Sequence, residues 1–153
     1  MLKIAIVGTG NISHNHIQGY LQFADRCQIV ALVDIYPEKA EEKKRHYGLT
    51  EAKVYASHQD ILGDPDIDVF DICTPPYVHA QISIDALTAG KHVLCEKPMA
   101  ASLQECDAMI SAAQASGKTL SIIAQNRFTD AFWRLKKVID SGEAGKVLSL
   151  IHI

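Results

Sequence analysis

Residues 3–13 constrain the fold more than any other part of the chain, because an apolar run there breaks into glycines and then into a helical pattern. Residues 4–7 are continuously apolar, which is typical of a parallel strand buried on both faces. Gly8 then supplies a tight turn, and Gly10 lets the backbone approach a pyrophosphate at the start of the following helix. Ser13 stands at the third glycine position and is small enough for close helix–strand packing. The stretch predicts the opening of a dinucleotide-binding βαβ unit.

An acidic residue at the end of the second apolar run supports this prediction. The run at residues 29–33 ends in Asp34, where a carboxylate can accept hydrogen bonds from an adenosine ribose. The carboxylate would repel a 2′-phosphate, and residues 35–37 offer no arginine to neutralise one, so NAD is predicted in preference to NADP. Two alternatives stay open. One is an S-adenosylmethionine site, which uses a similar turn and acid; the other is a helix-capping role for Asp34 ahead of Pro37, which is compatible with ribose binding.

Length and charge narrow the possible classes of protein. A chain of 153 residues can bury the core of one three-layer domain, but it is too short for two. The net charge of −3 does not predict binding to nucleic acid or to an anionic membrane, both of which attract basic proteins. The chain enters a strand almost at once and contains no apolar run of transmembrane length, so we expect no signal peptide and a cytoplasmic location.

The cysteines and histidines do not suggest a metal site. The four cysteines show no CxxC spacing, and three of them lie in or beside predicted strands, which favours reduced, buried thiols over disulfides or zinc. His14 and His16 are two residues apart on a predicted helix, so they do not share a face. We therefore predict two surface histidines and no metal.

Strand and helix patterns alternate along the whole chain, which implies a doubly wound α/β fold of the Rossmann type, a parallel sheet in a three-layer αβα arrangement. Strand order 3-2-1-4-5-6 places the ligand crevice between strands one and four. The adenosine side then holds Asp34, and the nicotinamide and substrate side holds Thr74, Pro75, Lys97, Asn126 and Arg127. Further strands are expected at 53–55, 69–73, 92–95, 120–124 and 147–153, and helices at 37–47, 78–89, 102–116 and 131–141.

The run Gly90-Lys91-His92-Val93-Leu94-Cys95-Glu96-Lys97-Pro98 is the most specific motif in the chain. Together with residues 8–12, Asp34, residues 74–79, 125–127 and 142–147, it resembles the amino-terminal NAD-binding domain of the glucose–fructose oxidoreductase / inositol dehydrogenase / rhizopine-catabolism (Gfo/Idh/MocA) family. The resemblance covers essentially the whole chain. Pro76 stands where many members have asparagine, and Ser13 where many have alanine or glycine.

The resemblance implies hydride transfer between a nicotinamide cofactor and a sugar, cyclitol or polyol hydroxyl. Lys97 matches the family's active-site lysine, although its position alone is also that of a surface lysine in a βα loop. Glu96 either anchors this loop or contacts the nicotinamide ribose, and His79 is either a cofactor-side residue or simply the start of a helix. The residues predicted to bind the cofactor are Gly8, Thr9, Gly10, Asn11, Ile12, Asp34, Thr74, Pro75, His79, Glu96, Lys97, Asn126 and Arg127.

The same resemblance implies a second α/β domain, with a mostly antiparallel sheet, that this sequence lacks. We expect a Rossmann domain at residues 1–125, followed at 126–153 by a connecting helix and the first strand of a truncated second domain. That second domain usually carries the groups that move the hydroxyl proton, so the chain alone is expected to bind NAD without robust turnover. An unpaired apolar strand at the end predicts association into a homo-oligomer. The alternative function is a non-catalytic dinucleotide-binding or sensing module.

Overall fold

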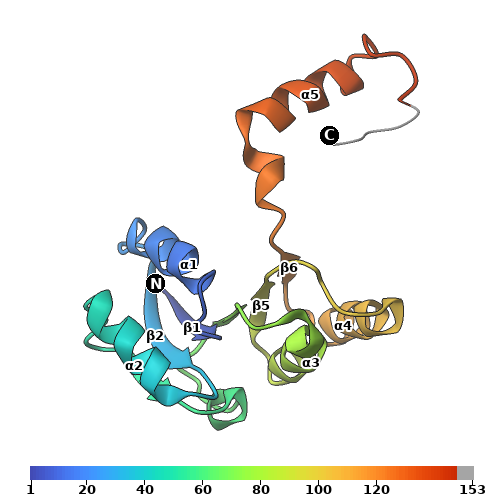
Figure 1. Ribbon diagram of the computed structural model, residues 1–153. Coiled ribbons are helices and arrows are strands. Elements are labelled where there is room, and N and C mark those ends of the chain that lie inside the picture. The colour runs from blue at the N-terminus through green and yellow to red at the C-terminus, as the bar shows by residue number, and fades with distance from the viewer. Residues whose placement is uncertain (148–153) are drawn as a thin grey trace. The chain divides into compact units, whose positions relative to one another are not determined.

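A computed structural model of the protein describes residues 1–147 (Figure 1). Within them, six strands form one sheet in the order β3-β2-β1-β4-β5-β6, and every neighbouring pair is parallel. This confirms the order predicted from the strand–helix alternation. The strands are β1 Leu2–Val7, β2 Cys27–Val33, β3 Lys53–Tyr55, β4 Val69–Ile72, β5 His92–Cys95 and β6 Leu120–Ile122.

The helices cover both faces of the sheet. Ala5 and Val7 belong to a core cluster with buried residues of α3 and α4, whereas Ile4 and Ile6 belong to a second cluster with those of α1 and α2. Because successive strand residues point to opposite faces, the two clusters are the two sides of a three-layer fold. The helices are α1 Ser13–Leu21, α2 Pro37–His46, α3 His79–Thr88, α4 Leu103–Ser116 and α5 Asp130–Asp140; the short 3-10 helices are η1 His58–Ile61, η2 Pro76–Val78 and η3 Gln125–Phe128.

Local sequence signals set the helix ends. The Ser102 hydroxyl accepts a hydrogen bond from the backbone N–H of Glu105, whose carboxylate accepts one from the backbone of Ser102, so α4 begins with a capping box. The helix ends at Gly117, which adopts the left-handed conformation with φ +66°. Of the part of the chain that the structure describes, no helix is long and apolar enough to cross a membrane.

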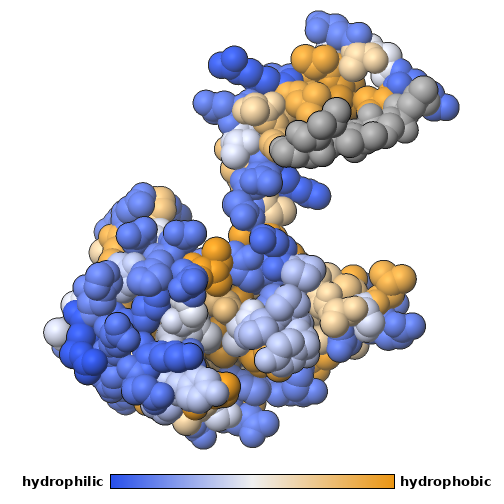
Figure 2. Space-filling model, viewed as in Figure 1, coloured by the Kyte–Doolittle hydropathy of each residue, from blue (hydrophilic) through white to orange (hydrophobic). Residues whose placement is uncertain are grey.

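The chain divides into two compact units, Met1–Ile123 and a second one that begins at Ala124. The sheet and its helices make up the first unit. The second contains η3 and α5, and α5 exposes Phe132, Trp133 and Val138 among other apolar side chains. Orange atoms gather on this unit in Figure 2. The strand predicted at 147–153 falls almost entirely on residues 148–153, which lie outside the described residues.

Candidate functional site

Gly8 follows β1 and lies close to the backbone just after the end of β4. Its φ is +93°, a left-handed conformation that favours glycine. A Cβ atom added to Gly8 would lie 2.8 Å from the carbonyl carbon of Cys73 and 2.9 Å from the nitrogen of Thr74. Only glycine therefore allows the two strand ends to approach this closely, at the point where the strand order reverses.

Asp34 is anchored to the glycine turn through Thr9. Its Oδ2 accepts hydrogen bonds from the backbone nitrogen of Thr9 at 2.9 Å and from the Thr9 hydroxyl at 2.7 Å, and its Oδ1 accepts one from the nitrogen of Tyr36 at 3.0 Å. Burial by itself raises the pKa of Asp34, but these hydrogen bonds and the charge of Lys39 outweigh it and hold the pKa below its usual value. The N-cap of α2 is Tyr36, without a side-chain cap, so Asp34 does not cap that helix.

The start of α1 is open. Within the described part of the chain, no side chain caps this helix, whose N-cap residue is Ile12, and a Cβ atom at Gly10 would meet no atom within 4 Å. Ser13 is fully buried, and its hydroxyl donates to the carbonyl oxygen of Gly10 at 2.7 Å, which closes the turn. A hollow of about 480 Å³ lies here; its lining residues are Thr9, Gly10, Asn11, His14, Lys39, Glu42, Lys43 and His46. Free N–H groups and basic side chains at a helix N-terminus suit an anion such as a phosphate.

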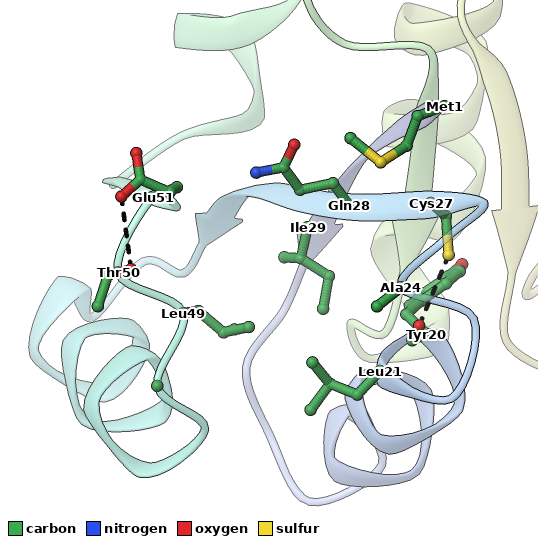
Figure 3. A pocket seen from close by; sticks show the side chains of 11 residues that line it. Met1, Tyr20, Leu21, Ala24, Cys27, Gln28, Ile29, Leu49, Thr50 and Glu51 are labelled. Carbon is green, nitrogen blue, oxygen red and sulfur yellow. Dashed lines mark hydrogen bonds between the residues drawn. The ribbon is translucent and has the colours of Figure 1, made fainter.

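A second hollow, of about 360 Å³, lies at the amino ends of the strands. It is formed beside the start of β2 by residues such as Cys27, Ile29 and Leu49 (Figure 3). None of the predicted site residues lines it. Because ligands of open α/β sheets bind outside the carboxyl ends of the strands, we place the candidate site at the glycine turn.

The segment after β4 carries Thr74, Pro75 and His79. The Thr74 hydroxyl is buried and lacks a hydrogen-bond partner among the described residues, whereas Pro75 is exposed. His79, the first residue of α3, is fully buried; its Nδ1 lies 2.9 Å from the carbonyl oxygen of Pro98 and its Nε2 lies 2.8 Å from that of Thr74. Both ring nitrogens are thus engaged by backbone, and His79 ties the segment after β4 to the segment after β5.

Lys97 follows β5 at the same edge of the sheet. Its side chain is exposed, and the peptide bond between Lys97 and Pro98 is cis. Glu96 is buried, and its Oε2 accepts a hydrogen bond from the backbone nitrogen of Lys97 at 2.9 Å. The carboxylate therefore fixes the backbone from which the exposed lysine projects, as one of the two roles predicted for Glu96 requires.

The prediction that His16 is a surface residue is wrong. Only 8% of its side chain is exposed, and its Nδ1 lies 2.8 Å from Asp71 Oδ2, while its Nε2 lies 3.2 Å from Glu96 Oε1. The rule that residues i and i+2 of a helix face apart separates His16 from His14, but it does not decide which of the two faces the sheet. His14 is half-buried beside Tyr47, with 2.5 Å between its Nδ1 and the tyrosine hydroxyl.

His16, Asp71 and Cys73 bring three potential metal-ligand atoms within 4.8 Å of one another. The separation of His16 and Asp71 is, however, that of a hydrogen bond between them, so each already satisfies the other. Cys73 and Cys95 are buried, and burial raises the pKa of both thiols. Cys27 and Cys106 are half-buried, and all four cysteines are free.

Asn126 and Arg127 lie in η3 of the second unit, and both are exposed. The assignment of these two residues to the nicotinamide side of the site stays a prediction.

Comparison with known proteins decides the family. Residues 2–124 match the oxidoreductase family described as an NAD-binding Rossmann fold. The chain belongs to this GFO_IDH_MocA family. The match confirms the resemblance found in the sequence, and its range ends one residue into the second unit.

Curated relatives in this family include inositol 2-dehydrogenases. The protein from Salmonella paratyphi B is 35% identical over 152 residues, which are 99% of this chain and 45% of that protein. The one from Burkholderia vietnamiensis is 34% identical over 150 residues, which are 97% of this chain and 44% of that protein. The chain thus spans less than half the length of these relatives.

Solved structures of dehydrogenases share the fold. The WlbA dehydrogenase from Bordetella pertussis, in complex with NADH and UDP-GlcNAcA, superposes with a TM-score of 0.89 at 32% identity, over 95% of this chain and 43% of that one. A levoglucosan dehydrogenase in complex with NADH gives a TM-score of 0.86 at 31% identity, over 96% of this chain and 41% of that one.

Proposed function

We propose that this chain is the cofactor-binding part of an NAD-dependent dehydrogenase that acts on a hydroxyl group of a sugar, cyclitol or polyol. The observation that carries the proposal is the link between Asp34 and Thr9, which joins an ionised carboxylate to the glycine turn at the carboxyl ends of β1 and β2. Family membership and the dehydrogenases among the relatives support it. A cytoplasmic location and a homo-oligomeric state belong to the same proposal.

The residues at the carboxyl edge of the sheet fit the parts of a dinucleotide. The open start of α1, at Gly10, Asn11 and Ile12, suits the pyrophosphate. Asp34 would accept hydrogen bonds from the adenosine ribose. The buried hydroxyl of Thr74 has no hydrogen-bond partner among residues 1–147 and is therefore available to a ligand, and we assign Thr74 and Pro75 to the nicotinamide side.

Lys97 is the proposed catalytic residue. When bound, the nicotinamide supplies a ring carbon that accepts or releases a hydride. The ammonium group of Lys97 would donate a hydrogen bond to the oxygen of the substrate and hold its carbinol hydrogen over that ring, which combines positioning with electrostatic stabilisation. The buried carboxylate of Glu96 holds the backbone of Lys97 while the side chain stays exposed to substrate. An exposed lysine on a buried anchor favours the enzyme over a non-catalytic module.

The role of Asp34 can be tested by titrating the chain with NADH and NADPH while following nicotinamide fluorescence. Wild type is expected to prefer NADH. Asp34→Ala removes charge-assisted hydrogen bonds to the ribose, each contributing roughly 1.5–3 kcal/mol, so the dissociation constant for NADH should rise by about tenfold or more and the preference should disappear. Asp107→Ala, at an exposed position on α4, is the control. An unchanged preference for NADH in Asp34→Ala would contradict this role.

A further inference from the structure

His16 connects two acids, one on β4 and one just beyond the end of β5. From α1, its Nδ1 reaches both oxygens of Asp71 on β4, at 2.8 and 3.0 Å, and its Nε2 reaches Glu96 just beyond β5 at 3.2 Å. The three side chains are 8%, 0% and 8% exposed, respectively, so water contributes little to their hydrogen bonding. A buried polar or charged side chain of this kind is costly to leave without a hydrogen-bond partner.

The protonation state of His16 decides whether both contacts exist. Ionised carboxylates only accept hydrogen bonds, and a neutral imidazole has a single N–H donor. When both carboxylates are ionised, both hydrogen bonds therefore require the doubly protonated ring. Burial by itself lowers the pKa of His16, but the hydrogen bonds and charges of Asp71 and Glu96 outweigh it and raise the pKa above its usual value.

Other titratable groups also face this network. Tyr20, on α1, interacts with Asp71. Cys73 follows β4, and its Sγ lies 3.4 Å from His16 Nδ1. The charge of Lys43, on α2, by itself lowers the pKa of Cys73. Burial raises the pKa of the Tyr20 hydroxyl and of the Cys73 thiol, and the Asp71 charge adds to both shifts, so both groups stay neutral at ordinary pH. Of the imidazole, the phenol and the thiol, the imidazole of His16 is thus the group that changes charge near neutral pH.

The network ends at the backbone of Lys97. One carboxylate oxygen of Glu96 faces His16, and the other accepts the N–H of Lys97 at 2.9 Å. We propose that His16 is a positioning residue, which holds the Glu96 carboxylate in the orientation that fixes the Lys97 backbone at the site. This proposal rests on the proposed function of Lys97. Asp71 orients the imidazole from the other side. Deprotonation of His16 leaves one donor for two carboxylates and releases one of these contacts.

The proposal can be tested on the whole chain by NMR, without any cofactor. The pH titration of the His16 ring and that of the Lys97 backbone amide proton are recorded together. A shared midpoint above about pH 6.5 is expected, because the charge of His16 determines the orientation of the Glu96 carboxylate, which accepts the hydrogen bond of this amide. In His16→Gln, the Lys97 titration should be lost. His58→Gln, which alters a histidine paired with Asp85 elsewhere in the fold, should keep it.

A Lys97 amide that stays constant while the His16 ring titrates in wild type would overturn the proposal, and this result needs no variant to fold. An unchanged Lys97 titration in His16→Gln would overturn it as well. Failure of the proposed function appears separately, as an absence of NADH binding by wild type, because the amide titration is measured without NADH.

Discussion

Replacement of Gly8 by alanine is expected to lower the free energy of unfolding by about 3 kcal/mol and to abolish NADH binding. A backbone with φ +93° is strained for any residue with a side chain. The added Cβ atom would also lie 2.8 Å from backbone carbon of Cys73, where no flexible side chain can move away. The ends of β1 and β4 must separate to make room, which opens the base of the proposed crevice. Chemical denaturation and NADH fluorescence measure the two effects.

Gly10→Ala is the matched control, because it adds the same methyl group two residues away. Its Cβ atom would meet no atom of residues 1–147 within 4 Å, so the free energy of unfolding should change by less than about 1 kcal/mol. NADH affinity should still fall, since the methyl group occupies space proposed for the pyrophosphate. If Gly8→Ala proves as stable as Gly10→Ala, the close approach of the two strand ends is not what holds the turn.

Asp71→Ala is the other change with a large expected effect. Asp71 is fully buried on the central strand β4, and its removal leaves His16 without one of its two partners. Breaking a buried ion pair costs roughly 3–5 kcal/mol, so we expect a loss of about 3 kcal/mol in the free energy of unfolding at pH 6. Asp107→Ala, on the exposed surface of α4, should change it by less than about 0.5 kcal/mol.

The effect of Asp71→Ala should depend on pH. The pKa of His16 is raised in the folded protein, so the stability that its charge contributes is fully present below about pH 6.5 and is lost as the pH rises through the folded value. The difference between wild type and Asp71→Ala should therefore be largest near pH 6 and smaller at pH 9. A difference that grows between these pH values would mean that His16 is not the charged partner of Asp71.

The architecture could be predicted from sequence because its signals are local. Apolar runs of strand length alternate with helical patterns, and this alternation allows few topologies. The Ser102 and Glu105 pair marked the start of α4, and Gly117 marked its end. Predicted boundaries were less exact where two short elements follow each other, as at residues 120–124, where β6 ends at Ile122 before η3 begins.

The buried network of His16 could not be found by reasoning along a single helix. Its partners lie 55 and 80 residues away along the chain, on β4 and beyond β5. One signal was nevertheless present: Asp71 interrupts an otherwise apolar run in a strand predicted to be central. A buried carboxylate requires a donor, and a histidine on the helix covering that face is a natural candidate.

Other features of the site also needed the folded structure. That no described residue forms a hydrogen bond with the buried Thr74 hydroxyl follows from the packing around it, which the sequence does not reveal. His79 illustrates the same limit, because both of its sequence interpretations were reasonable. In the structure it begins α3, and its buried ring joins the carbonyl oxygens of Thr74 and Pro98. We therefore expect it to support the cofactor site through these two segments.

The most direct test of the account is to record backbone amide spectra of the chain with and without NADH. We expect saturable shifts at Gly8–Ile12, Asp34, Thr74 and Lys97, because NADH is proposed to lie across the carboxyl ends of β1 and β4. Residues of the opposite hollow, such as Ile29 and Leu49, should remain unchanged. Shifts confined to that hollow, or no shifts at saturating NADH, would contradict the proposed site.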